Sequence, residues 1–472
     1  MADRFGLPQH PVQRIHFVGI GGAGMSGIAE VMVNLGYTVS GSDLGQNRAT
    51  ARLQGLGAKI MHTHAAENVT QADVVVHSGA IAGDNPELKA AVSQRIPIVP
   101  RAEMLGELMR FQQGIAVAGT HGKTTTTSLI ASVLAECSMD PTFVIGGRLH
   151  SAGSNARLGT GRWLVAEADE SDGSFLRLMP VVAVLTNIDN DHLAAYGNDF
   201  SRLSEAFVAF MNRIPFYGLS VVCLDDPNAA AILPAIHRRV VTYGTAAGAD
   251  YRIRNISPEG GSTLYELVTP HGRTERLRVN LVGAHNVLNA TAAVALALEF
   301  GGDIEAIGRA LEGFEGVARR SNVLGHYELD GKRFLLVDDY GHHPREIAAV
   351  LDAFRAAWPG RRLVVVFQPH RYSRTAALLD DFANVLSTTD ALLLLNVYPA
   401  GEAPLSQGDA RALVNAVRTR HLVDPVYLGE PARLAEFLSA QLEDDDIVLF
   451  FGAGDIGRMV QAFRDTLQAV PA

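Results

Sequence analysis

The chain has 472 residues, of which 47% are hydrophobic and 19% charged, and its formal net charge is −10 at pH 7. This length is too great for one hydrophobic core and suggests about three domains. The negative charge argues against nucleic acids and membranes as partners, so any phosphate group must be bound by local loops. The polar N-terminus, the two isolated cysteines and the lack of a long apolar run predict a cytoplasmic protein with reduced thiols.

Short β-branched segments alternate with Ala- and Leu-rich segments along the whole chain. This alternation is typical of α/β domains built on parallel sheets. Polar stretches near residues 100–112 and 313–322 suggest two boundaries. The expected domains are therefore 1–108, 109–317 and 318–472.

Several segments have the length and the neighbours of buried strands. Within residues 240–280, turns at Gly260-Gly261 and His271-Gly272 indicate a small antiparallel patch. The strands expected elsewhere are Val74–His77, Val181–Thr186, Leu363–Phe367, Leu392–Leu395 and Ile447–Phe451.

The first recognisable unit is a strand at Ile15–Val18, a loop with glycines at 19, 21 and 24, and a helix over Met25–Leu35. A second strand, Tyr37–Ser40, ends near Asp43. This pattern predicts a pyrophosphate at the helix N-terminus, with Asp43 free to accept a hydroxyl group. A nicotinamide or flavin dinucleotide and a UDP-sugar both fit, and the loop alone does not choose between them.

A second loop follows the apolar segment Ile115–Ala118 and precedes a helical segment, Ser128–Glu136. Val117 replaces the first glycine of the common P-loop pattern, which leaves a shorter Gly-Thr-His-Gly-Lys-Thr loop. Its backbone N–H groups and Lys123 suit the phosphates of a nucleoside triphosphate, and the Thr124 hydroxyl suits Mg²⁺.

Acidic and polar residues are concentrated where the next two expected strands end. Glu167 stands at the end of the first and is a candidate Mg²⁺ ligand. The acids just after it, at 169, 170 and 172, fit a solvated turn. After the second strand, His192 follows Asp189 and Asp191 and is a candidate for a second Mg²⁺.

Further along, Asn286 and Asn289 are three residues apart at the start of a helical segment. Their shared face favours a role at adenine or ribose, and a simple helix cap explains them equally well.

Two more polar clusters follow strands in the last third of the chain. The first contains Asp338, Asp339, His342 and His343, and the second contains His370-Arg371 and Arg374. Arginine suits carboxylate and phosphate groups, and we expect a helix from Thr375 onward to add to the attraction for anions at Arg374. Zinc is disfavoured at the two histidines because no second ligand pair at zinc spacing occurs.

Taken together, these segments resemble the Mur ligases of bacterial peptidoglycan synthesis, in family order and over nearly the whole chain. The matching motifs are Gly19–Gly24 with Met25–Ala29, Gly119–Thr124, Glu167–Asp172, Asp191-His192 with Tyr196-Gly197, His285-Asn286 with Asn289, Arg319-Arg320, Asp338–Pro344 and His370–Arg374. One departure is Ser321-Asn322, where the family usually has an aromatic or large apolar residue. The carbamylated lysine of later family members has no clear counterpart.

The resemblance implies three α/β domains: a Rossmann-like N-terminal domain, a central P-loop ATPase domain, and a Rossmann-like C-terminal domain that closes over the site. It implies UDP-sugar binding by Gly19, Gly21, Gly22, Gly24, Met25, Ser26, Asp43, His77, Ser78 and Gly79. It implies ATP binding by Gly119, Thr120, His121, Gly122, Lys123, Thr124, Thr125, Asn286, Asn289 and Arg320. The implied metal ligands, for two Mg²⁺ ions, are Thr124, Glu167 and His192.

For the third domain the resemblance implies amino-acid binding by Tyr340, His342, Arg371 and Arg374. The implied catalytic set is Lys123, His192, Asp339, His342, His370 and Arg374, with His342 or His370 as the base. The motifs are most like those of the member that acts first, which implies ATP-dependent ligation of L-alanine to UDP-N-acetylmuramate through an acyl phosphate. We expect a monomer or a weak homodimer.

Three other functions compete with this interpretation. A nicotinamide-dependent oxidoreductase explains the first glycine loop but not the second. A non-catalytic ATP-binding module explains Lys123 but not the clusters of the third domain. A recycling ligase that attaches a preformed peptide to the same sugar is the nearest rival within the family.

Overall fold

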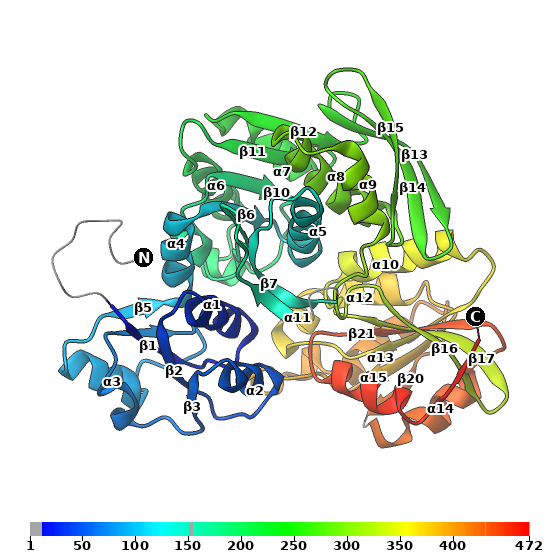
Figure 1. Cartoon of the computed structure of the whole chain (residues 1–472). Helices are drawn as coiled ribbons and strands as arrows, with labels where there is room; N and C mark the ends of the chain where they lie inside the picture. The colour runs from blue at the N-terminus through cyan, green and yellow to red at the C-terminus, as the bar shows by residue number, and fades with distance from the viewer. Residues whose placement is uncertain (1–11, 151–153, 430, 472) are drawn as a thin grey trace. The chain divides into compact units, whose positions relative to one another are not determined.

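The computed structural model describes residues 12–150, 154–429 and 431–471. The described strands form three sheets, each the centre of an α/β domain, as the sequence predicts (Figure 1). By its internal contacts the chain divides into two compact units. One runs to Arg254 and adds Glu266–Leu277 and Leu288–Glu315. The other comprises Asn255–Tyr265, Arg278–Val287 and the chain from Gly316 onward.

The first sheet has the strand order β3-β2-β1-β4-β5, and all its strands run parallel, as in a Rossmann-like domain. Its strands are β1 (Arg14–Val18), β2 (Thr38–Ser42), β3 (Lys59–Met61), β4 (Val74–His77) and β5 (Ile98–Pro100). Its helices are α1 (Ala23–Asn34), α2 (Arg48–Gly55) and α3 (Pro86–Ser93), and α4 (Arg101–Phe111) leads to the next sheet.

The second sheet has the order β15-β14-β13-β12-β11-β10-β6-β9-β7-β8. Its strands are β6 (Gln113–Ala118), β7 (Thr142–Leu149), β8 (Ser154–Arg157), β9 (Trp163–Glu167), β10 (Val182–Leu185), β11 (Leu219–Cys223), β12 (Val240–Gly244), β13 (Tyr251–Glu259), β14 (Ser262–Val268) and β15 (Thr274–Val279). Its helices are α5 (Lys123–Glu136), α6 (Phe200–Asn212), α7 (Pro227–Ile232), α8 (Ala284–Glu299) and α9 (Ile304–Glu312). The two predicted turns join β13 to β14 and β14 to β15, so these neighbouring strands form hairpins.

The third sheet has the order β20-β19-β18-β21-β17-β16-β22. Its strands are β16 (Asn322–Leu329), β17 (Lys332–Asp339), β18 (Leu363–Phe367), β19 (Ala391–Leu395), β20 (Val426–Gly429), β21 (Asp446–Phe451) and β22 (Gln468–Val470). Its helices are α10 (Pro344–Ala357), α11 (Tyr372–Ala377), α12 (Leu379–Leu386), α13 (Ala410–Arg418), α14 (Leu434–Gln441) and α15 (Ile456–Arg464).

The central strands are largely apolar because helices cover both faces of a parallel sheet. In β18 and β21, for example, every residue is buried. The predicted strands are found within one or two residues of their expected ends. Three helices begin earlier than expected: α1 at Ala23 instead of Met25, α5 at Lys123 instead of Ser128, and α11 at Tyr372 instead of Thr375.

The early start of α5 has a local cause. The threonines of its first turns have low intrinsic helix propensity, which hides the helix in the sequence. In the structure, the hydroxyls of Thr127 and Ser128 donate to the carbonyls four residues earlier, at 2.8 Å each.

Among the described helices, none has both the length and the apolar character that crossing a bilayer requires.

Candidate functional site

The loop after β6 has the shape of an anion-binding site. Gly119 and Gly122 have φ angles of +132° and +80°, and α5 begins directly after Gly122. A Cβ atom at Gly119 would lie 2.1 Å from Thr186 Oγ1, and one at Gly122 would lie 2.6 Å from Asn289 Oδ1. Glycine is therefore required at both positions. The loop presents the N-terminus of a 14-residue helix, which attracts phosphate.

Lys123 is held in this loop by several acceptors. Its Nζ donates to Gly119 O at 2.5 Å, to Thr120 O at 3.1 Å and to Glu170 Oε2 at 2.8 Å. Burial by itself would lower the pKa of Lys123, but the negative charge of Glu170 and neighbouring acids outweighs it and raises the pKa. The lysine is therefore charged at neutral pH.

Glu170 lies in a different environment from the solvated turn that the sequence suggests. Its residue is only 1% exposed, and Tyr196 Oη donates to its backbone carbonyl at 2.5 Å. The prediction of a solvated acid was wrong for Glu170, because the chain turns back after β9 and buries this side chain against Lys123. Through Lys123, Glu170 thus contacts the Gly119–Thr124 loop, the proposed nucleotide loop, and sequence reasoning missed this contact.

Thr124 and Glu167, two of the predicted metal ligands, lie together. Thr124 Oγ1 donates to Glu167 Oε2 at 3.2 Å, and the backbone N–H of Gly146 donates to Glu167 Oε1 at 2.6 Å. A hydroxyl and a carboxylate beside a phosphate loop are the hard oxygen donors that Mg²⁺ prefers. His192 lies in another loop, with its Nε2 3.5 Å from Asp191 Oδ2.

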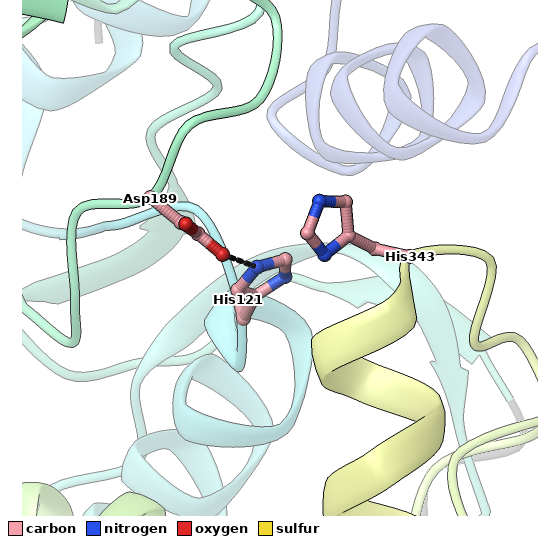
Figure 2. Close-up of side chains that lie close together, drawn as sticks. All are labelled: His121, Asp189 and His343. Atoms are coloured by element: carbon pink, nitrogen blue, oxygen red, sulfur yellow. Dashed lines mark hydrogen bonds and ion pairs between the residues drawn. The ribbon is translucent and has the colours of Figure 1, made fainter. Parts of the chain in front are cut away.

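The loop after β10 forms hydrogen bonds with the Gly119–Thr124 loop. The Asn187 side chain accepts from the His121 N–H at 2.8 Å and donates to the His121 carbonyl at 3.0 Å. The Asp189 N–H donates to Thr120 Oγ1 at 2.8 Å. Figure 2 shows the His121 ring directed at Asp189, with 2.9 Å between Nε2 and Oδ2. These contacts fix the two residues that precede Gly122.

The two asparagines of α8 have separate partners. Asn289 Oδ1 accepts from Thr126 Oγ1 at 3.1 Å, which links α8 to α5. Asn286 Nδ2 donates to Val282 O at 2.9 Å, in the turn before the helix. A role for either at the nucleotide stays a prediction.

The first glycine loop is closed by contacts from β2 and the segment after it. The N–H groups of Gly19 and Ile20 donate to Ser42 O, at 2.8 and 3.1 Å. The Gly21 N–H donates to Asp43 Oδ2 at 2.8 Å. Asp43 Oδ1 accepts from the Gly45 N–H at 2.9 Å. Each Asp43 oxygen thus accepts one backbone N–H group, and a role for Asp43 at the sugar nucleotide stays a prediction.

The other residues predicted for the sugar nucleotide lie near this loop. A Cβ at Gly19 would be 3.6 Å from Ser78 Cβ, so Ser78, which directly follows β4, lies beside the loop. Ser78 Oγ accepts from the Ala80 N–H at 3.3 Å. Gly22, Gly24, Met25 and Ser26 occupy the N-terminus of α1, where Ser26 Oγ donates to Ala23 O at 3.1 Å.

In the second unit, the loops after β17 and β18 bring His342 and His370 together, with ring centroids 5.8 Å apart. Tyr398 stacks on His370 at 5.5 Å, and Arg374 Nη1 lies 3.4 Å from His370 Nδ1. Burial is the main cause that lowers the pKa of both histidines to about 4. They are neutral at pH 7, so an imidazole nitrogen is available to accept a proton.

Tyr398 is a neighbour of this site that the sequence analysis did not single out. It lies after β19, and its backbone pairs with that of the His370 loop: the Arg371 N–H donates to Tyr398 O at 2.9 Å. The missed signal was its position after β19, which is the parallel neighbour of β18, because ligand-facing residues gather at the ends of adjacent parallel strands. Arg374 lies within α11 and not just before it, because that helix begins at Tyr372.

Asp339 has a clear structural task. Its Oδ2 and Oδ1 accept from the N–H groups of Ser321 and Gly341, at 2.6 Å each. Burial is the main cause that raises its pKa. Tyr340 lies under two guanidinium groups, those of Arg319 and Arg320, at 5.1 and 4.8 Å from the ring centroid. Asp339 therefore connects the 319–321 turn to the loop after β17. Ser321 takes part in this connection through its backbone N–H group.

The adjacent histidines after β17 have different partners. His342 Nδ1 lies 3.2 Å from Tyr340 O. His343 is the N-cap of α10 and accepts from the Arg345 N–H at 3.4 Å. Arg371, predicted for the amino acid, lies 3.8 Å from Glu402.

Comparison with protein-family models places three consecutive matches on the chain. Residues 14–113 match the Mur ligase family catalytic domain, residues 117–297 the Mur ligase middle domain, and residues 319–454 the Mur ligase glutamate ligase domain. The chain belongs to the Mur ligase family. The glycine loops and the strand-end clusters described above are thus those of a Mur ligase, as the motif order predicted.

Individual Mur ligases of known name and structure agree with this assignment. The UDP-N-acetylmuramate–L-alanine ligase of Xylella fastidiosa (strain 9a5c) is 58% identical over 449 residues, which are 95% of this chain and 94% of that protein. That of Xanthomonas oryzae pv. oryzae (strain PXO99A) has the same identity and coverage. The UDP-N-acetylmuramate-alanine ligase structure from Thermotoga maritima matches with a TM-score of 0.81 at 30% identity, over 96% of this chain and 98% of that one. A murein peptide ligase from Psychrobacter arcticus shares the fold, with a TM-score of 0.70 at 23% identity, over 98% of this chain and all of that one.

Proposed function

We propose that this Mur ligase joins L-alanine to the lactyl carboxylate of UDP-N-acetylmuramate at the expense of ATP, in peptidoglycan synthesis. The observation that carries the proposal is 58% identity, over 95% of the chain, to ligases named for this reaction. The two glycine loops, one suited to a pyrophosphate and one to a triphosphate, support it. A nicotinamide-dependent oxidoreductase leaves the second loop without a use.

ATP fits the loop around Lys123, whose charge lies at the N-terminus of α5. Thr124 and Glu167 would hold Mg²⁺, and His192 would serve a second ion. The metal supplies neutralisation of the charge on the transferring phosphoryl group. Glu170 holds Lys123 in place, and the contacts of Asn187 with His121 keep the loop rigid. Asn286, Asn289 and Arg320 are proposed for the rest of the nucleotide.

The reaction needs an activated carboxylate and a neutral amine. Transfer of the γ-phosphoryl group to the lactyl carboxylate gives an acyl phosphate and ADP. The amine of L-alanine then attacks the acyl carbon, the C–N bond forms, and phosphate leaves. We propose that Tyr340, Arg371 and Arg374 bind L-alanine and that the neutral imidazole of His342 or His370 takes the amine proton.

We also propose the domain boundaries 1–108, 109–317 and 318–472, a cytoplasmic location that suits the free thiols of Cys137 and Cys223, and a monomer or weak homodimer. Because the acyl phosphate hydrolyses in water, catalysis requires the third domain to close over the nucleotide site.

Phosphate release from ATP tests the proposal, with UDP-N-acetylmuramate and either L-alanine, other amino acids or the peptide that a recycling ligase would use. Release that requires both UDP-N-acetylmuramate and L-alanine, and that is lost in Lys123→Ala, supports it. Release with UDP-N-acetylmuramate and the peptide, but not with L-alanine, would assign the chain to the recycling ligases instead. No release with any pair would overturn the ligase function.

A further inference from the structure

A cation from α4 lies against the first glycine loop. Arg101 is the first residue of α4 and directly follows β5. A Cβ atom at Gly24 would lie 3.1 Å from Arg101 Nη1 and 3.2 Å from its Cδ. The arginine side chain therefore packs on the first turn of α1, where the sugar nucleotide's pyrophosphate is proposed to bind.

The first turn of α1 provides no charged side chain of its own. It has no acidic and no basic residue, and its N-cap, Gly22, offers no side chain. Its side-chain hydroxyl is already engaged, since Ser26 Oγ donates to Ala23 O at 3.1 Å and accepts from Asn155 Nδ2 at 3.3 Å. A helix N-terminus carries only about half a positive charge. A pyrophosphate carries more negative charge than this turn alone can balance.

Arg101 has a charge to offer. Within the described part of the chain, its ion pair is with Asp169, at 3.9 Å, and the two side chains are 26% and 45% exposed. An ion pair that is long and half open to water is weak. A guanidinium group held this loosely can turn to an incoming phosphate without a large loss of stability.

We propose that Arg101 is a binding residue for the pyrophosphate of the sugar nucleotide, acting together with the backbone N–H groups at the N-terminus of α1. This inference rests on the proposed function, which supplies the UDP-sugar. The planar guanidinium group donates two parallel hydrogen bonds to phosphate oxygens, which a lysine does not match. Asp169 then keeps Arg101 near the loop while the sugar nucleotide is absent.

The test is calorimetric binding of UDP-N-acetylmuramate, UDP-N-acetylglucosamine and uridine to the full chain. Arg101→Gln should weaken both UDP-sugars by roughly tenfold to a hundredfold, because charge-assisted hydrogen bonds are lost. Uridine, which has no phosphate, should bind as before. Arg110→Gln is the matched control, since Arg110 lies in the last turn of the same helix, is 57% exposed and pairs with Glu107.

The alternatives give different results. Equal weakening of uridine would overturn the proposal in favour of a structural role. Weakening of UDP-N-acetylmuramate alone would also overturn it and assign Arg101 to the lactyl carboxylate. Unchanged binding of both UDP-sugars would overturn it outright.

A further variant separates phosphate binding from charge balance at Asp169. If Arg101 only neutralises Asp169, Asp169→Asn in the Arg101→Gln background would restore binding; we expect the double variant to stay weak. Phosphate release by the wild-type chain tests the ligase function separately. A wild-type chain that binds UDP-sugars without turnover would overturn the function and leave this inference standing.

Discussion

Lys123 Nζ lies 2.8 Å from Glu170 Oε2, and their side chains are only 15% and 1% exposed. The lysine proposed to bind phosphate is thus already paired with a buried carboxylate. Bound ATP would therefore bring further negative charge to a lysine that already has Glu170 as its ion-pair partner. This pair links the stability of the nucleotide loop to its chemistry.

Removing the Lys123 side chain should affect both catalysis and the stability of the fold. Lys123→Ala should abolish phosphate release and lower the free energy of unfolding by about 3 kcal/mol, because Glu170 is left buried and unpaired. Denaturant unfolding and a phosphate assay measure the two effects. The double variant with Glu170→Gln should regain most of the stability and none of the activity. Unchanged stability in Lys123→Ala would contradict this view of the pair.

Glu167 should determine the requirement for Mg²⁺. Glu167→Gln keeps the shape but removes the charge beside Thr124 Oγ1, 3.2 Å away. We expect the half-saturating Mg²⁺ concentration for phosphate release to rise by roughly tenfold or more. Glu136→Gln, at the far end of α5 and 3.0 Å from Arg309, is the control and should show no change. A normal Mg²⁺ response in Glu167→Gln would exclude Glu167 as a ligand.

A methyl group at Gly122 should be more harmful than backbone strain alone predicts. Gly57 has a φ angle of +99° and open space around its Cα, so Gly57→Ala should cost only about 1 kcal/mol of stability. Gly122→Ala has both a positive φ and a clash with Asn289. We expect a larger loss of stability and a higher KM for ATP. Equal behaviour of the two variants would show that the clash is relieved without cost.

His342 should make folding sensitive to acid. Burial is the main cause that lowers its pKa from 6.5 to about 4. Below pH 6.5 the unfolded chain takes up this proton and the folded chain does not, so stability falls as the pH drops from 6.5 to 4. The difference between wild type and His342→Asn should change by about 2 kcal/mol over this range. Denaturant unfolding of the two proteins at several pH values measures this difference, and a difference that stays constant from pH 6.5 to 4 would contradict the prediction.

Local sequence patterns were enough to predict the strands and the residues that follow them. Apolar segments such as Leu363–Phe367 are recognisable because a covered parallel strand must be apolar throughout. The carboxyl ends of such strands gather at one edge, so the positions of the two glycine loops and the histidine clusters after strands predict that they form sites. The order of the motifs also predicted the family.

What the sequence did not reveal depends on which strands are neighbours. β6 lies between β10 and β9, so the loops after both reach the nucleotide loop between them. That arrangement gives Lys123 its partner Glu170, which in the sequence looks like any acid of a polar turn. The closeness of His370 and Tyr398 has the same origin, in the adjacency of β18 and β19.

The amino-acid sequence by itself therefore determined the elements, their chemistry and the family, because these follow from local periodicity and short motifs. Only the tertiary structure decided which side chains are buried together and which backbone N–H groups the Asp43 carboxylate accepts. It also decided which cation lies against Gly24. The physical reason is that burial and pairing arise between segments far apart in the chain, after the sheets have set their order.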